Sequence, residues 1–320
     1  MPVASPVDIV SLGEAMVEFN QTGERDGRLY LQGFGGDTSN FAIAAARQGA
    51  RVAYVSALGD DPYGRLLRQL WDEEGVDHAD VPTNADAFTA IYFVTHDETG
   101  HQFSFFRSGS AASRMSPAQL PRERIASARV LHLSGISLAI SPAACDTAYA
   151  AIDMARQAGV KVSFDTNLRL KLWPIDRARA VMSDVIARSD LCLPSYDDVV
   201  AITGIADPDA LVDHCLRLGA KVVALKLGDQ GALIADGNQR HRIAPHPCQP
   251  VDATGAGDTF GGAFVHRWLQ GDSLELAGCY AATAAALSTQ GYGAVAPIPS
   301  AGQVLGALQA TTTSRHTDHD

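Results

Sequence analysis

The sequence predicts an α/β fold with a doubly wound, mainly parallel sheet and a small inserted β-sheet lid. Three observations favour this class. Short apolar runs alternate with amphipathic segments of helical length along most of the 320 residues. Two β-rich stretches, about 14–34 and 86–107, interrupt that alternation. Late in the chain, Val251–Phe260 ("VDATGAGDTF") places an acid directly after Gly-Ala-Gly, at the start of an amphipathic segment.

The first half of the chain begins with strands and helices in turn. The apolar run "VDIVSLG" predicts a buried strand, and "TSNFAIAAARQGA" predicts a helix with Thr38 or Ser39 as N-cap and Gly49 as C-cap. A strand "RVAYVSALG" and a helix "YGRLLRQLWDEEG" follow. In Phe88–Arg107 two β-rich runs flank "DETG", which is typical of a β-hairpin. We expect this hairpin to pair with the earlier β-rich stretch and form the lid.

The second half returns to regular alternation. The sequence predicts strands at "RVLHLSG", "VKVSFDTN", "DLCLPS" and "KVVALKLG", with helices such as "PAACDTAYAAIDMARQAG" and "DRARAVMSDVIARS" between them. A strand pair, "GALIADG" and "QRHRIAP", precedes the Gly-Ala-Gly loop and two Ala-rich helices. Strands linked in this way form a parallel sheet that is covered on both faces. We therefore expect 1–320 to be one domain, with 311–320 as a disordered polar tail.

Composition argues against several classes of function. A net charge of −11 disfavours nucleic acid or an anionic membrane as a partner, because both require clustered Lys and Arg. The five cysteines are far apart and lack metal-ligand spacing, so we interpret them as reduced thiols. The N-terminal residues show no signal-peptide pattern, and no apolar run has the length of a membrane span. We expect a cytoplasmic protein.

The loop Gly255, Ala256 and Gly257 has the properties of an anion site. Glycines at a helix N-terminus let unpaired backbone amides approach an anion, and the helix dipole favours negative charge there. Asp258 follows in the first turn, where the dipole favours its ionised form. An ionised carboxylate in this position can accept the proton of a hydroxyl that attacks a γ-phosphoryl group. The alternative is an Asp that only caps a helix.

Two other phosphate-binding motifs are disfavoured. The chain contains no GxxxxGK[ST] sequence, so it lacks a P-loop. A dinucleotide-binding fold would place GxGxxG after the first strand, whereas "GAGDTFG" has another spacing and lies late in the chain. An NAD-linked enzyme is therefore a weak alternative.

Two long segments resemble the signatures of the ribokinase-like, phosphofructokinase-B-type carbohydrate kinases. "DATGAGDTF" resembles the C-terminal signature of that family, and "GGDTSNFAIAAARQGARVAYVSALGDD" resembles its N-terminal signature. The second match includes Gly35, Gly36, Asn40, Gly49 and Gly59. The signatures occur in the expected order, and the resemblance covers nearly the whole chain. It implies a large doubly wound domain with a β lid over the sugar.

The resemblance also implies roles in phosphoryl transfer. Asp258 would be the catalytic base, beside an anion hole formed by Gly255, Ala256 and Gly257. The cofactors would be ATP and Mg²⁺, often with a monovalent cation such as K⁺. Contacts to the nucleotide would come from Asn167, Lys226, Gly228 and Gly231. The family's Asn-x-x-Glu near the metal appears here as Ser195–Asp198, so Asp198 would take the place of the Glu, and an Asn often found near adenine is absent.

Two arginines suggest which kind of substrate the protein binds. Arg107 ends the predicted hairpin and Arg169 follows a strand, and the planar guanidinium group suits a carboxylate. Their contexts, "RSGSA" and "DTNLRLKLW", resemble those of 2-keto-3-deoxygluconate kinases, although either arginine alone is as typical of a surface ion pair. The same resemblance implies that Gly36, Asn40 and Tyr92 touch the sugar acid. Phe105 replaces a tyrosine common in those kinases, and Glu14 is either a sugar contact or a solvated lid residue.

Together these features predict an ATP-dependent kinase that phosphorylates the 6-hydroxyl of 2-keto-3-deoxy-D-gluconate. The first alternative is a fructokinase-like or other hexose kinase, which has less need of the two arginines. The second is a catalytically silent sugar-acid sensor, although the intact Asp258 loop argues against it. We also expect a homodimer formed through the lid.

Overall fold

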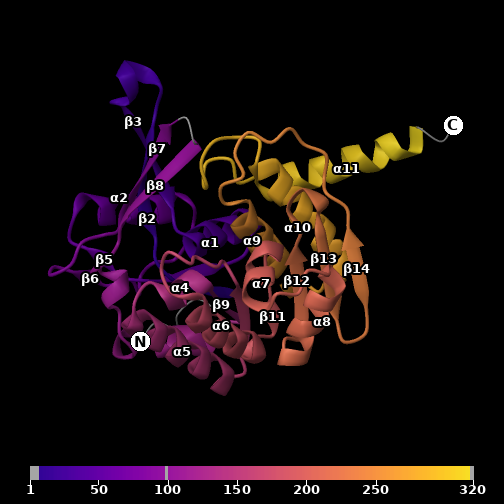
Figure 1. Cartoon of the computed structure of the whole chain (residues 1–320), viewed down its shortest axis with the longest axis horizontal. Coiled ribbons are helices and arrows are strands. Elements are labelled where there is room, and N and C mark those ends of the chain that lie inside the picture. The colour runs from indigo at the N-terminus through magenta and orange to yellow at the C-terminus, as the bar shows by residue number, and fades with distance from the viewer. Residues whose placement is uncertain (1–6, 98–99, 318–320) are drawn as a thin grey trace.

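A computed structural model of the chain describes residues 7–97 and 100–317 (Figure 1). In that part of the chain, the central sheet has eight strands in the order β14-β13-β12-β11-β10-β9-β1-β4. Strands β12 to β4 of this order pair in parallel, and β13 and β14 pair antiparallel at one edge. The predicted doubly wound, mainly parallel sheet is confirmed. Its strands are β1 (Ile9–Leu12), β4 (Val52–Val55), β9 (Val130–Ser134), β10 (Lys161–Asp165), β11 (Leu191–Cys192), β12 (Val222–Lys226), β13 (Ala232–Asp236) and β14 (Arg240–Ile243).

Helices cover both faces of this sheet, and each face has its own hydrophobic core. Side chains alternate along a strand, so Ile9 of β1 packs into one core and Val10 and Leu12 pack into the other. The first core contains residues of α1 (Asp37–Arg47), α2 (Pro62–Glu73), α9 (Ala256–Leu269), α10 (Leu274–Ser288) and α11 (Ala301–Thr317). The second contains residues of α3 (Arg122–Ser127), α4 (Gly135–Ala139), α5 (Pro142–Gln157), α6 (Ile175–Arg188), α7 (Tyr196–Thr203) and α8 (Pro208–Leu218).

A smaller sheet forms the lid and projects from one end of the main domain (Figure 1). Its strands lie in the order β3-β2-β7-β8, so the two β-rich stretches pair as the sequence predicted. Strands β7 and β8 form the predicted hairpin, whose turn residues 98–99 lie outside the described residues. The bounds are β2 (Met16–Gln21), β3 (Tyr30–Gly35), β7 (Ile91–Asp97) and β8 (Gly100–Phe106), and a separate short pair joins β5 (Leu58–Gly59) to β6 (Thr83–Asn84).

Helix ends differ from the sequence prediction at two places. Helix α1 begins at Asp37 after Gly36, which has φ of +107° and no side-chain cap, instead of at a Thr38 or Ser39 cap. Helix α11 continues to Thr317, into the segment predicted to be a disordered tail, and 318–320 lie outside the described residues. No helix in the described ranges has both the length and the apolar character needed to cross a bilayer.

Candidate active site

The N-termini of α1 and α9 meet at the predicted catalytic loop. Glycines 261 and 262 of α9 let the two helices pack closely, because a Cβ at Gly262 would lie 2.7 Å from the carbonyl oxygen of Phe41. Asn40, in the first turns of α1, donates a hydrogen bond from Nδ2 to Oδ2 of Asp258, at 2.8 Å. The contact joins the two sequence signatures across 218 residues. Gly255 is the N-cap of α9 and has φ of +77°, a conformation that favours glycine.

The protonation of Asp258 differs from the sequence expectation. Burial is the largest cause that raises its pKa, the nearby Asp37 and Asp165 carboxylates add to the rise, Asn40 and Lys226 oppose it, and together these effects place the pKa at about 8. The helix dipole, which the sequence predicted to keep this group ionised, is therefore outweighed by desolvation and by like charges. A carboxylate with a pKa near neutrality is well matched to proton transfer.

A network of acids and amides surrounds Asp258. Asn167 donates from Nδ2 to Oδ2 of Asp37 at 2.8 Å, and its φ of +28° is unusual for a residue other than glycine. Burial raises the pKa of Asp37, although hydrogen bonds from Ser134 and from the Thr38 amide oppose this. Lys226 forms an ion pair with Asp165 at the end of β10. The Lys226 ammonium group therefore lies among several carboxylates.

Removal of Asp37 is expected to shift the pH dependence of catalysis. The base must be ionised to accept a proton, so activity should fall as the pH drops below its pKa of about 8. The substitution Asp37→Asn removes a like charge, which lowers the pKa of Asp258 and moves the acidic limb of the kcat/KM profile to lower pH. Steady-state rates between pH 5 and 10 measure this limb, and an unmoved limb would contradict the coupling.

Five of the predicted nucleotide contacts share one pocket. A cavity of about 910 Å³ is lined by Lys226, Gly228, Gly231, Ala256 and Gly257. Its other walls include Pro245, Pro250, Ala282, Ala285 and Ala286, which offer apolar surface to a flat ring. A Cβ at Gly257 would lie 3.4 Å from the Lys226 Nζ atom, so the ammonium group is next to the anion loop. Gly255 and Asn167 are not among the lining residues of this cavity.

The backbone amides of the anion loop are not equivalent. The amide of Ala256 donates to the carbonyl of Ala253 at 3.2 Å. The amides of Gly257 and Asp258 follow in the first turn of α9, where an N–H has no acceptor within the helix. We therefore expect these later amides to contribute most to anion binding.

Asp198 lies beside the pocket in a hydrogen-bonded position. Its Oδ2 atom accepts from the hydroxyl of Thr166 and from the amide of Leu168, both at 3.0 Å, and burial raises its pKa. Among the described residues, no group of three or more His, Cys, Asp or Glu side chains is placed to hold a metal. A single carboxylate such as that of Asp198 is compatible with Mg²⁺, which protein sites typically hold through one or two carboxylates together with substrate phosphates.

The lid contributes Tyr92 and Phe105 to the other side of the site. Gly35 has no side chain, so the phenol of Tyr92 lies directly against its backbone, and the Tyr92 hydroxyl donates to Glu18. Burial raises the pKa of Glu18. The rings of Tyr92 and Phe105 stack at 5.4 Å, and Phe105 is 44% exposed. The lid therefore presents an aromatic surface next to Gly36.

The two arginines have different surroundings. Arg107 forms a buried ion pair with Glu14, in which Nη2 lies 2.6 Å from Oε2. Arg169 is exposed, donates to the carbonyl of Leu168 at 2.8 Å, and lowers the pKa of Asp37 by its charge. No ion pair of Arg169 occurs within 7–97 and 100–317. Arg169 is thus a cation near Asp37 that has no ion pair in this part of the chain.

Three buried polar atoms at the site have no hydrogen-bond partner within the described part of the chain. They are Oδ1 of Asn40, Nη2 of Arg107 and Oγ1 of Thr259. Buried polar groups in proteins are nearly always hydrogen-bonded, so such atoms point to a ligand. Asn40 and Arg107 were both predicted to contact the substrate. Oδ1 of Asn40 is a free acceptor for a sugar hydroxyl, whereas Nη2 of Arg107 lies 2.6 Å from Glu14 Oε2 without hydrogen-bonding geometry.

Sequence reasoning missed Asp37, Asp165 and the pairing of Glu14. Asp37 follows Gly35 and Gly36 at a helix start, as Asp258 follows Gly-Ala-Gly, so the same signal was available. Asp165 ends a buried strand at the edge of the sheet where ligands bind in open α/β folds. The Glu14 pairing had no local signal, because its partner lies 93 residues away.

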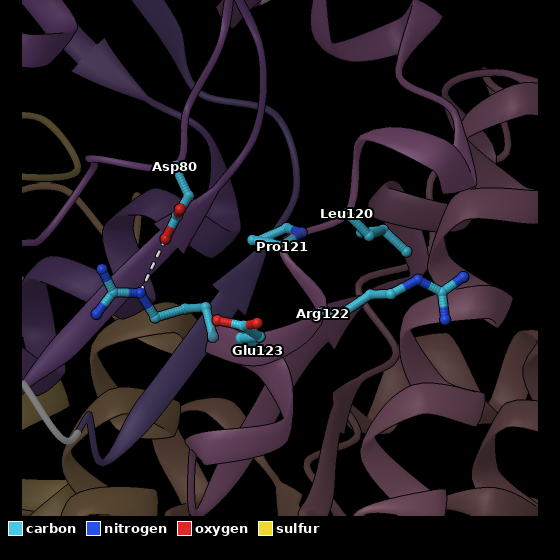
Figure 2. Close-up of a pocket in the computed structure, with 6 residues that line it drawn as sticks. Asp80, Leu120, Pro121, Arg122 and Glu123 are labelled. Atoms are coloured by element: carbon cyan, nitrogen blue, oxygen red, sulfur yellow. Dashed lines mark hydrogen bonds and ion pairs between the residues drawn. The ribbon is translucent and has the colours of Figure 1, made fainter. Parts of the chain in front are cut away.

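Another hollow of about 370 Å³ lies away from these residues. Figure 2 shows Asp80 facing an arginine that hydrogen-bonds to it, while the side chain of Arg122 points away from that pair. The partner is Arg124, which lies 2.8 Å from Asp80 and 2.9 Å from Asp77. Asp80 and Arg124 are paired within the wall, and we assign this hollow no role.

The chain is similar over most of its length to known carbohydrate kinases. Residues 7–301 match the family model described as pfkB family carbohydrate kinase. The chain is 34% identical to fructokinase-1 of Oryza sativa subsp. japonica, with 94% of this chain and 98% of that protein covered. It is 33% identical to 2-dehydro-3-deoxygluconokinase of Thermoproteus tenax, with 93% and 94% covered.

A solved structure shares the fold. The fructokinase from Vibrio cholerae O395, in a form that binds fructose, ADP and calcium, superposes with a TM-score of 0.85 at 27% identity and covers 95% of this chain and 99% of its own. The family match spans both signatures, the lid and the Asp258 loop. The chain therefore belongs to the pfkB family of carbohydrate kinases, with a ribokinase-like fold, and is a phosphotransferase with an alcohol group as acceptor.

Proposed function

We propose that this kinase transfers the γ-phosphoryl group of ATP to the 6-hydroxyl of 2-keto-3-deoxy-D-gluconate. The observation that carries the proposal is the contact between Asn40 and Asp258. One amide group holds the base through Nδ2 and keeps a buried Oδ1 atom free to accept from a sugar hydroxyl. Asp258 also follows the loop that lines the 910 Å³ cavity, so base, acceptor and nucleotide meet at the start of α9.

The chemical step follows from this arrangement. The 6-hydroxyl oxygen attacks the γ-phosphorus, its proton passes to a carboxylate oxygen of Asp258, and the bond to the β-phosphate oxygen breaks to release ADP. The first-turn amides of α9 and the Lys226 ammonium stabilise the negative charge on the transferred group. When bound near Asp198, Mg²⁺ would neutralise phosphate charge. The lid would exclude water, which competes as an acceptor.

Arg169 supports an anionic acceptor. Its guanidinium group is exposed, lies near Asp37 and can bind a carboxylate in bidentate fashion. A fructokinase-like activity is the second candidate, because Glu14 neutralises Arg107. Of the two arginines that the sequence suggested, only Arg169 then lacks an ion pair among the described residues. Relatives of both activities have similar identity to this chain.

A coupled assay of ADP release tests the acceptor. With ATP and Mg²⁺, we expect 2-keto-3-deoxygluconate to be preferred over fructose, ribose and gluconate. The substitution Arg169→Ala should lower kcat/KM for the keto-deoxy acid roughly tenfold or more and that for fructose much less, since it removes a charge-assisted hydrogen bond. A preference for fructose would refute the substrate assignment, and no turnover of any sugar would favour the sensor reading.

The lid is also a proposed dimer interface. Large apolar side chains of its strands are exposed, among them Leu31 at 66% and Phe106 at 55%. Such surface on a soluble protein typically marks an interaction site. We propose that a second copy covers it, and sedimentation equilibrium would show a monomer if this is wrong.

A further inference from the structure

A buried ion pair joins the main domain to the lid. Glu14 follows β1, Arg107 follows β8, and their side chains are 1% and 10% exposed. Arg107 donates from Nε to Oε2 of Glu14 at 2.7 Å, and Ser110 donates to Oε1 at 2.5 Å. Both carboxylate oxygens of Glu14 are therefore held, and its orientation towards Arg107 is fixed.

The pair adjoins the proposed acceptor site. The carbonyl of Glu14 packs directly against Gly36, the N-cap of α1, where a Cβ would overlap it. The guanidinium carbon of Arg107 lies 5.8 Å from the centre of the Phe105 ring, which stacks on Tyr92. The Nη2 atom of Arg107 lies close to Glu14 Oε2 but has no acceptor in hydrogen-bonding geometry among the described residues. Arg107 can therefore donate to an acceptor sugar while it remains paired.

The pairing changes what Arg107 offers to that sugar. Burial raises the pKa of Glu14, and the charge of Arg107 and the hydrogen bond from Ser110 oppose the rise. As an ion pair, the two side chains carry no net charge, so Arg107 supplies hydrogen-bond donors without a net attraction for an anion. The Asp37 carboxylate, whose charge also raises the pKa of Glu14, adds no positive charge.

We propose that Glu14 is a specificity-determining residue that limits the preference of this kinase for anionic acceptors by neutralising Arg107. This inference rests on the proposed function, because it requires an acceptor beside Arg107. The measurable quantity is the ratio of kcat/KM for 2-keto-3-deoxygluconate, an anion, to kcat/KM for fructose, a neutral sugar.

The substitution Glu14→Gln tests the proposal. It keeps the size and an acceptor oxygen but leaves Arg107 with an unbalanced positive charge. The ratio should rise roughly tenfold, as expected for one additional charge at close range in a partly buried site. Glu14→Asp, which keeps the charge, should leave the ratio within about twofold of the wild type even if both rates fall. A ratio unchanged in folded Glu14→Gln would overturn the proposal.

Glu74→Gln is the matched control. Glu74 also pairs with an arginine through both oxygens, since Arg47 lies 2.8 Å and 2.6 Å from them. Arg47 lies in the last turn of α1, and Asn40 lies near its start, about 10 Å along the helix at 1.5 Å per residue. Glu74→Gln therefore frees an arginine in the same way but away from the acceptor. The ratio of kcat/KM values in this variant should remain that of the wild type.

A second pair of variants keeps the proposal testable if Glu14→Gln does not fold. Arg107→Gln leaves Glu14 unbalanced, so the ratio should fall roughly tenfold. The double variant Glu14→Gln/Arg107→Gln has no charge at either position, and its ratio should return to within about twofold of the wild type. A purely structural role would lower both acceptor rates together and would not restore the ratio in the double variant.

The result also separates the two proposals. If the wild type neither phosphorylates nor binds either acceptor by calorimetry, the proposed function fails and the inference fails with it. The other outcome is that the wild type acts on either sugar while the ratio of kcat/KM values is the same in Glu14→Gln, in Arg107→Gln and in the double variant. In that case only the inference is overturned.

Discussion

Asp258→Asn is expected to reduce kcat about 10³-fold, the middle of the usual range of about 10²–10⁴-fold for loss of a general base. The change is nearly isosteric, and the new amide can turn its oxygen towards Asn40 Nδ2, so the contact between α1 and α9 is retained. Binding of the acceptor and of ATP, measured by calorimetry, should change only a few fold. Retained turnover would exclude Asp258 as the base.

Stability provides a second measurement for this variant. The pKa of Asp258 in the folded protein is raised to about 8, above its usual value of 3.8, so folding disfavours the ionised form. The wild type should therefore lose stability as the pH rises from about 4 through 8, and it carries the full cost of the buried charge at pH 9. Asn lacks this charge, so the variant should melt at an equal or higher temperature at pH 9.

A control at the other end of α9 distinguishes the base from an ordinary helix-end acid. Asp272 lies just beyond the C-terminal end of α9 and pairs with Arg267 at 2.6 Å. Asp272→Asn removes the same charge at a position outside the site, and we expect kcat to stay within about twofold of the wild type because partly exposed ion pairs contribute little. A comparable loss in both variants would indicate damage to α9 instead of loss of a base.

Local sequence patterns account for much of this fold. Strands such as β9 and β10 are short apolar runs bounded by polar residues, so their existence follows from burial alone. The lid was predictable because β2, β3, β7 and β8 break the strand and helix alternation. The predicted start of α1 was wrong, because Thr38 and Ser39 are residue types that often cap helices. Gly36 instead packs closely against Glu14, and the helix begins at Asp37 without a side-chain cap.

The charges of the site residues could not be predicted from local sequence patterns. The Asp258 motif identifies the acid, but its pKa depends on Asp37 and Asp165, which come from other elements. The sequence around Arg107 suggested a carboxylate-binding site. It could not show that Glu14, which lies far away in the chain, pairs with this arginine. Motifs specify which groups are present, and only the tertiary arrangement specifies which charges cancel. The substrate is therefore the property least determined by these patterns.

The geometry of Gly255 leads to the second large effect. Its φ of +77° is strained for any residue with a side chain, and an added Cβ would lie 2.8 Å from the carbonyl oxygen of Ala294. Gly255→Ala must therefore displace either the N-terminus of α9 or the loop that contains Ala294. Either movement shifts the first-turn amides away from the phosphoryl group, and loss of such donors costs about 10²–10³ in kcat.

Gly271→Ala separates this geometric effect from strain alone. Gly271 follows the other end of α9 and has φ of +89°, but an added Cβ there meets nothing within 4 Å. Both variants place alanine in a left-handed conformation, so both should lose about 1 kcal/mol of stability in chemical denaturation. Only Gly255→Ala should lose kcat by 10²-fold or more, because only that clash displaces the anion site. Equal kcat values in the two variants would show that the loop does not stabilise the transferred phosphoryl group.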